Sequence, residues 1–191
     1  MCWNKQRELM SQQDPLTEVT LESRRIFDGK VVNLRIDKVR LPNGKTSERE
    51  IVEHRQAVVI IPMDGEGRVL LVRQYRKAIE ASMLELPAGG MEEGETPEQS
   101  ADRELREETG YAPGKLERLT GFYVAPGYAE EYLHLFLATD LHESPLKPDE
   151  DEFAELVPMS LEGAVDMVFD RSINDAKSII GLLWVWRGRN A

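Results

Sequence analysis

The sequence predicts a mixed α/β fold (α+β), in which helices pack on a mixed sheet and a small antiparallel sheet comes first in the chain. Two observations support this fold class: strand-like segments stand before, between and after helical segments, and 191 residues suffice for one ordinary domain with a small extra subdomain. We therefore divide the chain into a polar lead-in expected to be disordered (1–16), an N-terminal antiparallel sheet (17–55) and a main domain (56–191).

The N-terminal segment reads as strands and turns. Residues 31–39 alternate in part between apolar and polar side chains, residues 41–44 (LPNG) form a strong turn signal, and residues 50–53 resume an extended pattern. A sheet this small needs a partner surface to bury its apolar side. Such a sheet fits a homodimer.

The main domain begins with a more hydrophobic block. Residues 57–62 (AVVIIP) predict a buried strand, and 64–67 (DGEG) a hairpin turn from which the chain returns at 69–72; residues 88–90 read as a loop. The later elements are expected as strands at 116–124, 132–138 and 155–159, and as helices at 97–109, 161–169 and 174–186.

Composition excludes several classes of protein. With 35 acidic against 24 basic residues, the net charge is −11 and the pI near 4.9, which disfavours binding to nucleic acid backbones. No apolar run approaches the ~20 residues that span a bilayer, and the N-terminus lacks the apolar region of a secretory signal. The single cysteine, Cys2, excludes a disulfide framework and favours a cytoplasmic location.

The helix expected at 97–109 carries clear signals at both ends. Thr96 suits the N-cap, Pro97 the first helical position, Gln99 completes a capping box, and Gly110 is placed to end the helix. Between these ends only two residues are clearly apolar, so the segment lacks the apolar stripe of an ordinary amphipathic helix.

The carboxylates of this helix share one face. Glu104, Glu107 and Glu108 stand at i, i+3 and i+4, where like charges repel each other. A hard divalent cation such as Mg²⁺ would turn that repulsion into binding, since carboxylate oxygens are its preferred protein ligands. The alternative is a solvated acidic face that Arg103 and Arg106 partly neutralise.

The spacing around this helix resembles the Nudix box, Gly-x5-Glu-x7-Arg-Glu-U-x-Glu-Glu-x-Gly-U, where U is a bulky apolar residue. Every fixed position is present, and only Tyr111 is a less usual choice for its place. The matching residues are Gly89, Glu95, Arg103, Glu104, Leu105, Glu107, Glu108 and Gly110. So many charged and glycine positions at the correct spacing are far more specific than a lone glycine-rich loop.

The resemblance implies a Nudix hydrolase: an α/β/α sandwich whose loop-helix-loop binds Mg²⁺ or Mn²⁺ and cleaves nucleoside diphosphates linked to another moiety. Glu104 and Glu108 would be the principal metal ligands. Glu107 would be a further ligand, direct or through water, with a part in catalysis, and the carbonyl of Ala88 could add another oxygen.

The same resemblance gives the remaining box residues supporting roles. Glu95 would pair with Arg103 and hold the loop against the helix, which orients the metal ligands. Gly89 would permit the tight loop, and Gly110 would end the helix.

Features outside the box resemble the ADP-ribose pyrophosphatase subfamily. They are the run RQYR at 73–76, the run LELPAG at 84–89, a proline fifteen residues beyond Tyr111 (Pro126), and the run DAKS at 175–178. The acidic stretch at 148–152 is similar to the loop that supplies a catalytic carboxylate in these enzymes. The resemblance then implies hydrolysis of ADP-ribose to AMP and ribose 5-phosphate, with Glu152 as the first candidate for the base and Glu150 as the second.

The implied substrate pocket draws on both parts of the chain. Arg73 is a candidate to contact the pyrophosphate, because a guanidinium forks onto phosphate oxygens. Glu85, in the run at 84–89, and Pro126 are further candidates that the subfamily resemblance implies. In this subfamily the N-terminal sheet swaps onto a second subunit, so Phe27, Arg25 and Glu53 are candidates to reach across a dimer.

Two alternatives remain at this point. Hydrolysis of another nucleoside diphosphate sugar, such as ADP-glucose or GDP-mannose, would leave the box unchanged. A nucleotide sensor without catalysis would instead show a damaged box or an appended DNA-binding segment, and the box here is intact. The scattered histidines, His54, His134 and His142, are not expected to be ligands.

Overall fold

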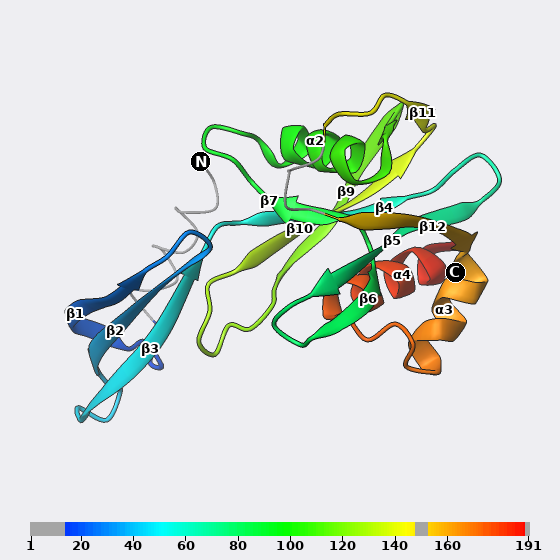
Figure 1. Cartoon of the computed structure of the whole chain (residues 1–191). Helices are drawn as coiled ribbons and strands as arrows, with labels where there is room; N and C mark the ends of the chain where they lie inside the picture. Colours follow the sequence, from blue (N-terminus) through cyan, green and yellow to red (C-terminus); the bar gives the residue numbers. More distant parts are fainter. Residues whose placement is uncertain (1–13, 148–152, 190–191) are drawn as a thin grey trace. The chain divides into compact units, whose positions relative to one another are not determined.

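A computed structural model describes residues 14–147 and 153–189 of the chain (Figure 1). Its contacts divide the chain into two compact units, each described here by itself. The first holds the chain up to residue 54 together with residues 125–130, and the second holds residues 55–124 and the chain from residue 131 on. The predicted lead-in at 1–16 falls mostly outside the described residues.

The first unit is built on a three-stranded antiparallel sheet in the order β1-β2-β3, with β1 at Val19–Asp28, β2 at Val32–Arg40 and β3 at Thr46–His54. The predicted turn at 41–44 is present, since the Gly44 N–H donates to the Leu41 carbonyl at 2.9 Å. Every residue of β1 is exposed within the chain. The loop at 125–130 joins this sheet through β3, where the Val52 N–H donates to the Tyr128 carbonyl at 2.8 Å.

The second unit holds the remaining strands, in two larger sheets and one short pair. One sheet has the order β7-β4-β10-β9, with β7 at Ala88–Gly90, β4 at Ala57–Pro62, β10 at Tyr132–Thr139 and β9 at Lys115–Tyr123. The other has the order β12-β5-β6, with β12 at Ala154–Ser160, β5 at Arg68–Arg76 and β6 at Ala81–Glu85. The short pair is β8 (Tyr111–Ala112) with β11 (His142–Glu143). Because β4 and β10 run parallel while the other pairs are antiparallel, the first of these sheets is mixed, as predicted.

Helices cover both faces of β4, whose six residues are all buried. Val58 and Ile60 pack in one core with α2 (Pro97–Thr109), while Val59 and Ile61 pack in a second core with α3 (Leu161–Phe169) and α4 (Ala176–Arg189). Successive side chains of a strand point to opposite faces, so one apolar run serves both cores. Figure 1 shows α2 on one side of these strands and α3 and α4 on the other. The predicted α/β/α sandwich is confirmed.

The predicted hairpin turn at 64–67 forms: the Asp64 N–H donates to the Arg68 carbonyl at 3.0 Å and Met63 bridges Val69 in antiparallel fashion, after which the two strands continue into different sheets. One local expectation was wrong. Residues 88–90, expected as a loop, form β7 against β4. The sequence Ala-Gly-Gly has no alternation of apolar and polar side chains that would predict a strand. The strand β7 forms because it pairs with β4, about thirty residues earlier in the chain.

Candidate metal and substrate site

The site is organised by α2, whose ends are fixed as the sequence predicted. The Thr96 hydroxyl accepts from the Gln99 N–H at 3.2 Å, and the Gln99 side chain accepts from the Thr96 N–H at 2.9 Å. At the other end Gly110 has a φ of 79° and its N–H donates to the Arg106 carbonyl. This left-handed conformation favours glycine because it lacks a Cβ. The helix register, and with it the position of each carboxylate, is therefore set locally.

Two glutamates of α2 lie against the loop that contains β7. The Glu104 side chain is buried, and a Cβ placed on Gly89 would stand only 2.0 Å from its Cδ, so only glycine permits this approach. The Glu108 carboxylate accepts from the Ala88 N–H at 3.1 Å. The predicted metal ligands Ala88, Glu104 and Glu108 are thus neighbours in the structure.

Arg103 ties the loop to the helix. Its guanidinium donates to both carboxylate oxygens of Glu95, at 2.8 and 3.0 Å, and to the Gly90 carbonyl at 3.0 Å. The Nη1 group lies 2.8 Å from an oxygen of Glu104 and 2.8 Å from an oxygen of Glu107. The hydrogen bond with Glu95 is the largest cause that raises the pKa of Arg103, and the same bond lowers the pKa of Glu95. Both groups therefore stay charged at neutral pH.

The predicted metal ligands are all oxygen atoms, which suit a hard divalent cation, but in the structure the carboxylates contact other groups of the protein. Within residues 14–147 and 153–189, no three Asp, Glu, His or Cys side chains converge around one point as metal ligands do. Arg103 lies between Glu104 and Glu107, and Glu108 faces the amide of Ala88. The donors are nevertheless all oxygens, and the absence of a Cβ at position 89 leaves the Glu104 carboxylate room beside the loop.

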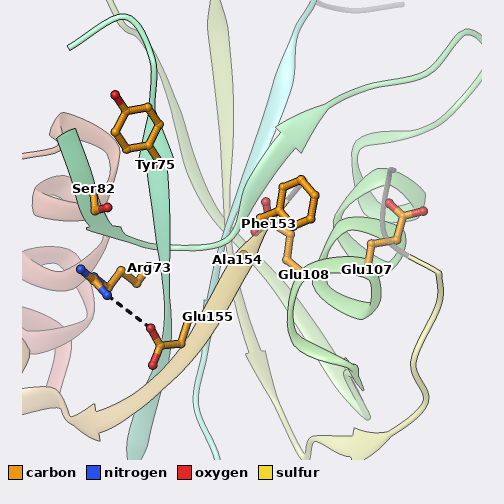
Figure 2. Close-up of a pocket in the computed structure, with 8 residues that line it drawn as sticks. All are labelled: Arg73, Tyr75, Ser82, Glu107, Glu108, Phe153, Ala154 and Glu155. Atoms are coloured by element: carbon orange, nitrogen blue, oxygen red, sulfur yellow. Dashed lines mark hydrogen bonds and ion pairs between the residues drawn. The ribbon is translucent and has the colours of Figure 1, made fainter. Parts of the chain in front are cut away.

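A pocket of about 470 Å³ adjoins the glutamates. Figure 2 shows Glu107 and Glu108 on α2, Arg73 and Tyr75 on β5, and Phe153 in the same cavity. Arg73 faces Glu155 of the neighbouring strand β12, with Nη1 and Oε2 3.5 Å apart and both side chains more than half exposed. The remaining lining residues are Ser82, Ala154 and Glu155. Arg73, predicted to contact phosphate, therefore shares a pocket with two predicted metal ligands.

Sequence reasoning missed several residues of this pocket. Tyr75 had a usable signal, because it stands two residues after Arg73 and so shares its face of β5. Ser82 and Glu155 had none, since they reach the pocket through the register of β5 with β6 and β12. The two candidate bases, Glu150 and Glu152, lie outside the described residues.

Glu85, predicted to bind substrate, is buried and has other partners in the structure. Its carboxylate accepts two hydrogen bonds from Arg76, at 2.8 and 2.9 Å, and a third from the Lys177 ammonium. Burial opposes the charge of Glu85, but the bonds and charges of Arg76 and Lys177 outweigh it and lower the pKa of Glu85. The carboxylate is 2% exposed and does not line the pocket.

The other predicted substrate residues belong to the first unit. Arg25 and Arg35 both form ion pairs with Glu53, and their hydrogen bonds lower its pKa. Phe27 is 56% exposed. Pro126 lines a separate hollow of about 310 Å³ in this unit, next to β3. The structure therefore brings Arg25 and Glu53 together.

No helix in the described part of the chain is long and apolar enough to cross a membrane. Residues 53–179 match the NUDIX domain, and residues 18–52 match the nucleoside diphosphate sugar hydrolase N-terminal domain.

Two curated relatives and one solved structure resemble nearly the entire chain. An ADP-ribose pyrophosphatase of Bacillus subtilis (strain 168) is 45% identical over 89% of this chain and 93% of its own. A methanol dehydrogenase activator of Bacillus methanolicus is 43% identical over 88% of this chain and 92% of its own. The crystal structure of an ADP compounds hydrolase superposes with a TM-score of 0.83 and 25% identity, covering 91% of this chain and 94% of that chain.

Proposed function

Because the chain belongs to the Nudix hydrolase family, we propose that it hydrolyses the pyrophosphate bond of ADP-ribose to AMP and ribose 5-phosphate, with Mg²⁺ or Mn²⁺ as cofactor. The observation that carries this proposal is the intact arrangement of Glu104 and Glu108 against Ala88 and Gly89. It stands in a chain 45% identical to an ADP-ribose pyrophosphatase over nearly its full length, which supports the choice of substrate. An intact carboxylate helix favours catalysis over a sensor role.

The residues that would hold the cation are Glu104, Glu107 and Glu108, together with the Ala88 carbonyl. When bound, the cation supplies positive charge to the pyrophosphate oxygens and makes a water molecule more acidic. The chain prepares this site in two ways: the missing Cβ at Gly89 admits the Glu104 carboxylate, and the Ala88 N–H orients Glu108.

Arg73 is the proposed contact for a substrate phosphate. Its side chain is 60% exposed and that of its ion-pair partner Glu155 is 69% exposed, so a phosphate can replace Glu155 at little cost. A loop carboxylate would then orient or deprotonate the attacking water, and Glu152 is the first candidate, with Glu150 second. Phe153, the residue after Glu152 in the chain, lines the pocket, which supports this assignment.

We propose a homodimer formed through the N-terminal sheet. All ten residues of β1 are exposed, and they include the large apolar side chains of Val19, Leu21, Ile26 and Phe27. A three-stranded sheet with this many exposed apolar side chains is expected to need a partner. In that dimer Phe27, Arg25, Glu53 and Pro126 remain the candidates to complete the substrate pocket.

A matched pair of variants tests the catalytic proposal. We expect Glu108→Gln to lower the turnover of ADP-ribose by at least about 100-fold, because a neutral amide cannot supply the charge that a cation requires. Glu93→Gln serves as the control, since Glu93 is an exposed glutamate in the loop before α2 and occupies an unspecified position of the box. Equal turnover in the two variants would contradict the proposed role of Glu108.

A further inference from the structure

The first turn of α4 makes more polar contacts than a helix start needs. Asp175 caps the helix, since its carboxylate accepts from the Ser178 backbone N–H at 3.1 Å. The same oxygen accepts from the Ser178 hydroxyl at 2.6 Å and from the Lys177 ammonium at 2.8 Å. The cap alone would use only the first of these contacts.

The additional contacts connect α4 to the loop that carries Ala88. The Ser178 hydroxyl, which donates to Asp175, accepts from the Leu86 N–H at 2.7 Å, and Ser178 is fully buried. This hydroxyl therefore uses both its donor and an acceptor site, and it fixes a backbone amide two residues before Ala88. Leu86 is itself buried, and Gly181 of α4 leaves room for it, since a Cβ there would stand 2.5 Å from Leu86 Cδ1.

Lys177 holds the residue that begins this loop. Its ammonium forms ion pairs with Glu85 and Asp175, and the Glu85 carboxylate is also paired with Arg76. A buried carboxylate is strongly unfavourable without its partners, so the pairs fix the end of β6 in one position.

The contacts continue as far as α2, the helix that carries the proposed cation ligands. The Pro87 carbonyl accepts from the Ile60 N–H of β4 at 2.9 Å, and the Ala88 N–H donates to Glu108 at 3.1 Å. Each residue from 85 to 88 is thus anchored by at least one polar contact, and the last of these contacts reaches a carboxylate of α2. Hydrogen bonds and ion pairs from the start of α4 hold residues 85 and 86, and the backbone continues from there to Ala88, whose N–H donates to Glu108 at the proposed cation site.

We infer that Lys177 and Ser178 are positioning residues that fix residues 85–88 and thereby set the affinity of the α2 glutamates for a divalent cation. The inference rests on the proposed function for the identity of the site. Outer residues that orient metal ligands change cation affinity or activity by roughly 10–100-fold. A purely structural role would lower stability and leave the cation affinity unchanged.

The test measures Mn²⁺ binding to the full-length protein without substrate, by titration followed with electron paramagnetic resonance. The variants are Ser178→Ala, which removes the partner of Leu86, and Lys177→Met, which keeps an unbranched side chain one atom shorter and removes its charge. The control is Ser160→Ala, because the Ser160 hydroxyl accepts a comparable backbone N–H, that of Gly163 at 3.1 Å, at the start of α3. Thermal unfolding in EDTA is recorded for all three.

We expect Ser178→Ala and Lys177→Met to bind Mn²⁺ about tenfold more weakly than the parent, and Ser160→Ala to bind it equally well despite a lower melting temperature. If Ser178→Ala does not fold, Lys177→Met decides the test, since it leaves the α4 cap in place. Unchanged Mn²⁺ affinity in the folded variants overturns the inference. If the two variants bind Mn²⁺ more weakly but the parent protein itself does not hydrolyse ADP-ribose, the positioning role is supported and the proposed function is refuted.

Discussion

Gly89→Ala is the most informative single substitution at the proposed metal site. The added methyl carbon would stand 2.0 Å from Glu104 Cδ and 2.1 and 2.2 Å from its two carboxylate oxygens. Non-bonded carbon atoms approach to about 3.5 Å, so the carboxylate must move by roughly 1.5 Å. A misplacement of about 1 Å in a catalytic group costs on the order of 100-fold in rate, so we expect at least that loss of kcat for ADP-ribose.

The cost in stability should be much smaller than the cost in activity. The clash involves the end of a flexible side chain, and overpacking of this kind costs about 1–3 kcal/mol. Gly90→Ala is the matched control, because a Cβ at the adjacent glycine meets no atom within 4 Å. The assay is the steady-state rate at saturating Mg²⁺, with urea unfolding of both variants. If Gly89→Ala and Gly90→Ala have equal kcat, the proposed role of the Glu104 carboxylate is wrong.

Three further predictions concern stability. Gly110→Ala should destabilise the protein by about 1–2 kcal/mol in urea unfolding, because the φ of 79° strains any residue with a Cβ; a loss no larger than that of Gly90→Ala would argue against this strain. Thr96→Ala should cost about 1 kcal/mol through loss of the N-cap, and an unchanged urea midpoint would contradict the capping role. Burial, then the charge of Arg118, lowers the pKa of His134 to about 4. The unfolded state therefore binds the proton more tightly, and His134 should reduce stability as pH falls from about 6.5 to about 4, by roughly 2 kcal/mol between pH 7.5 and 5.0. His134→Gln should show that much less pH dependence over the same interval, and an equal dependence would refute the assignment.

The sequence predicted best what depends on local signals. The bounds of α2 followed from Thr96, Pro97 and Gly110, each of which acts within one turn of the helix end. The strand β4 has the predicted bounds because a dense apolar run marks it within the chain, and the helix α3 also has the predicted bounds.

Features that depend on pairing between distant segments could not be predicted in the same way. The sequence motif suggested a substrate role for Glu85. No residue near Glu85 in the sequence indicated that its buried carboxylate pairs with Lys177, which lies 92 residues later. Likewise Glu155 reaches the pocket only because β12 pairs with β5 in a register that sets it beside Arg73. Such registers follow from the packing of the whole sheet rather than from the local pattern.

The most direct test of the central claim is a comparison of kcat/KM for ADP-ribose, ADP-glucose, GDP-mannose and NADH with Mg²⁺, with product identification. The account predicts that ADP-ribose has the highest value, that AMP and ribose 5-phosphate are formed, and that EDTA abolishes turnover. Preference for another of these substrates would contradict the proposed specificity. It would not contradict the proposed role of the α2 glutamates in metal binding. Tight binding of ADP-ribose without turnover would contradict the proposed enzyme itself.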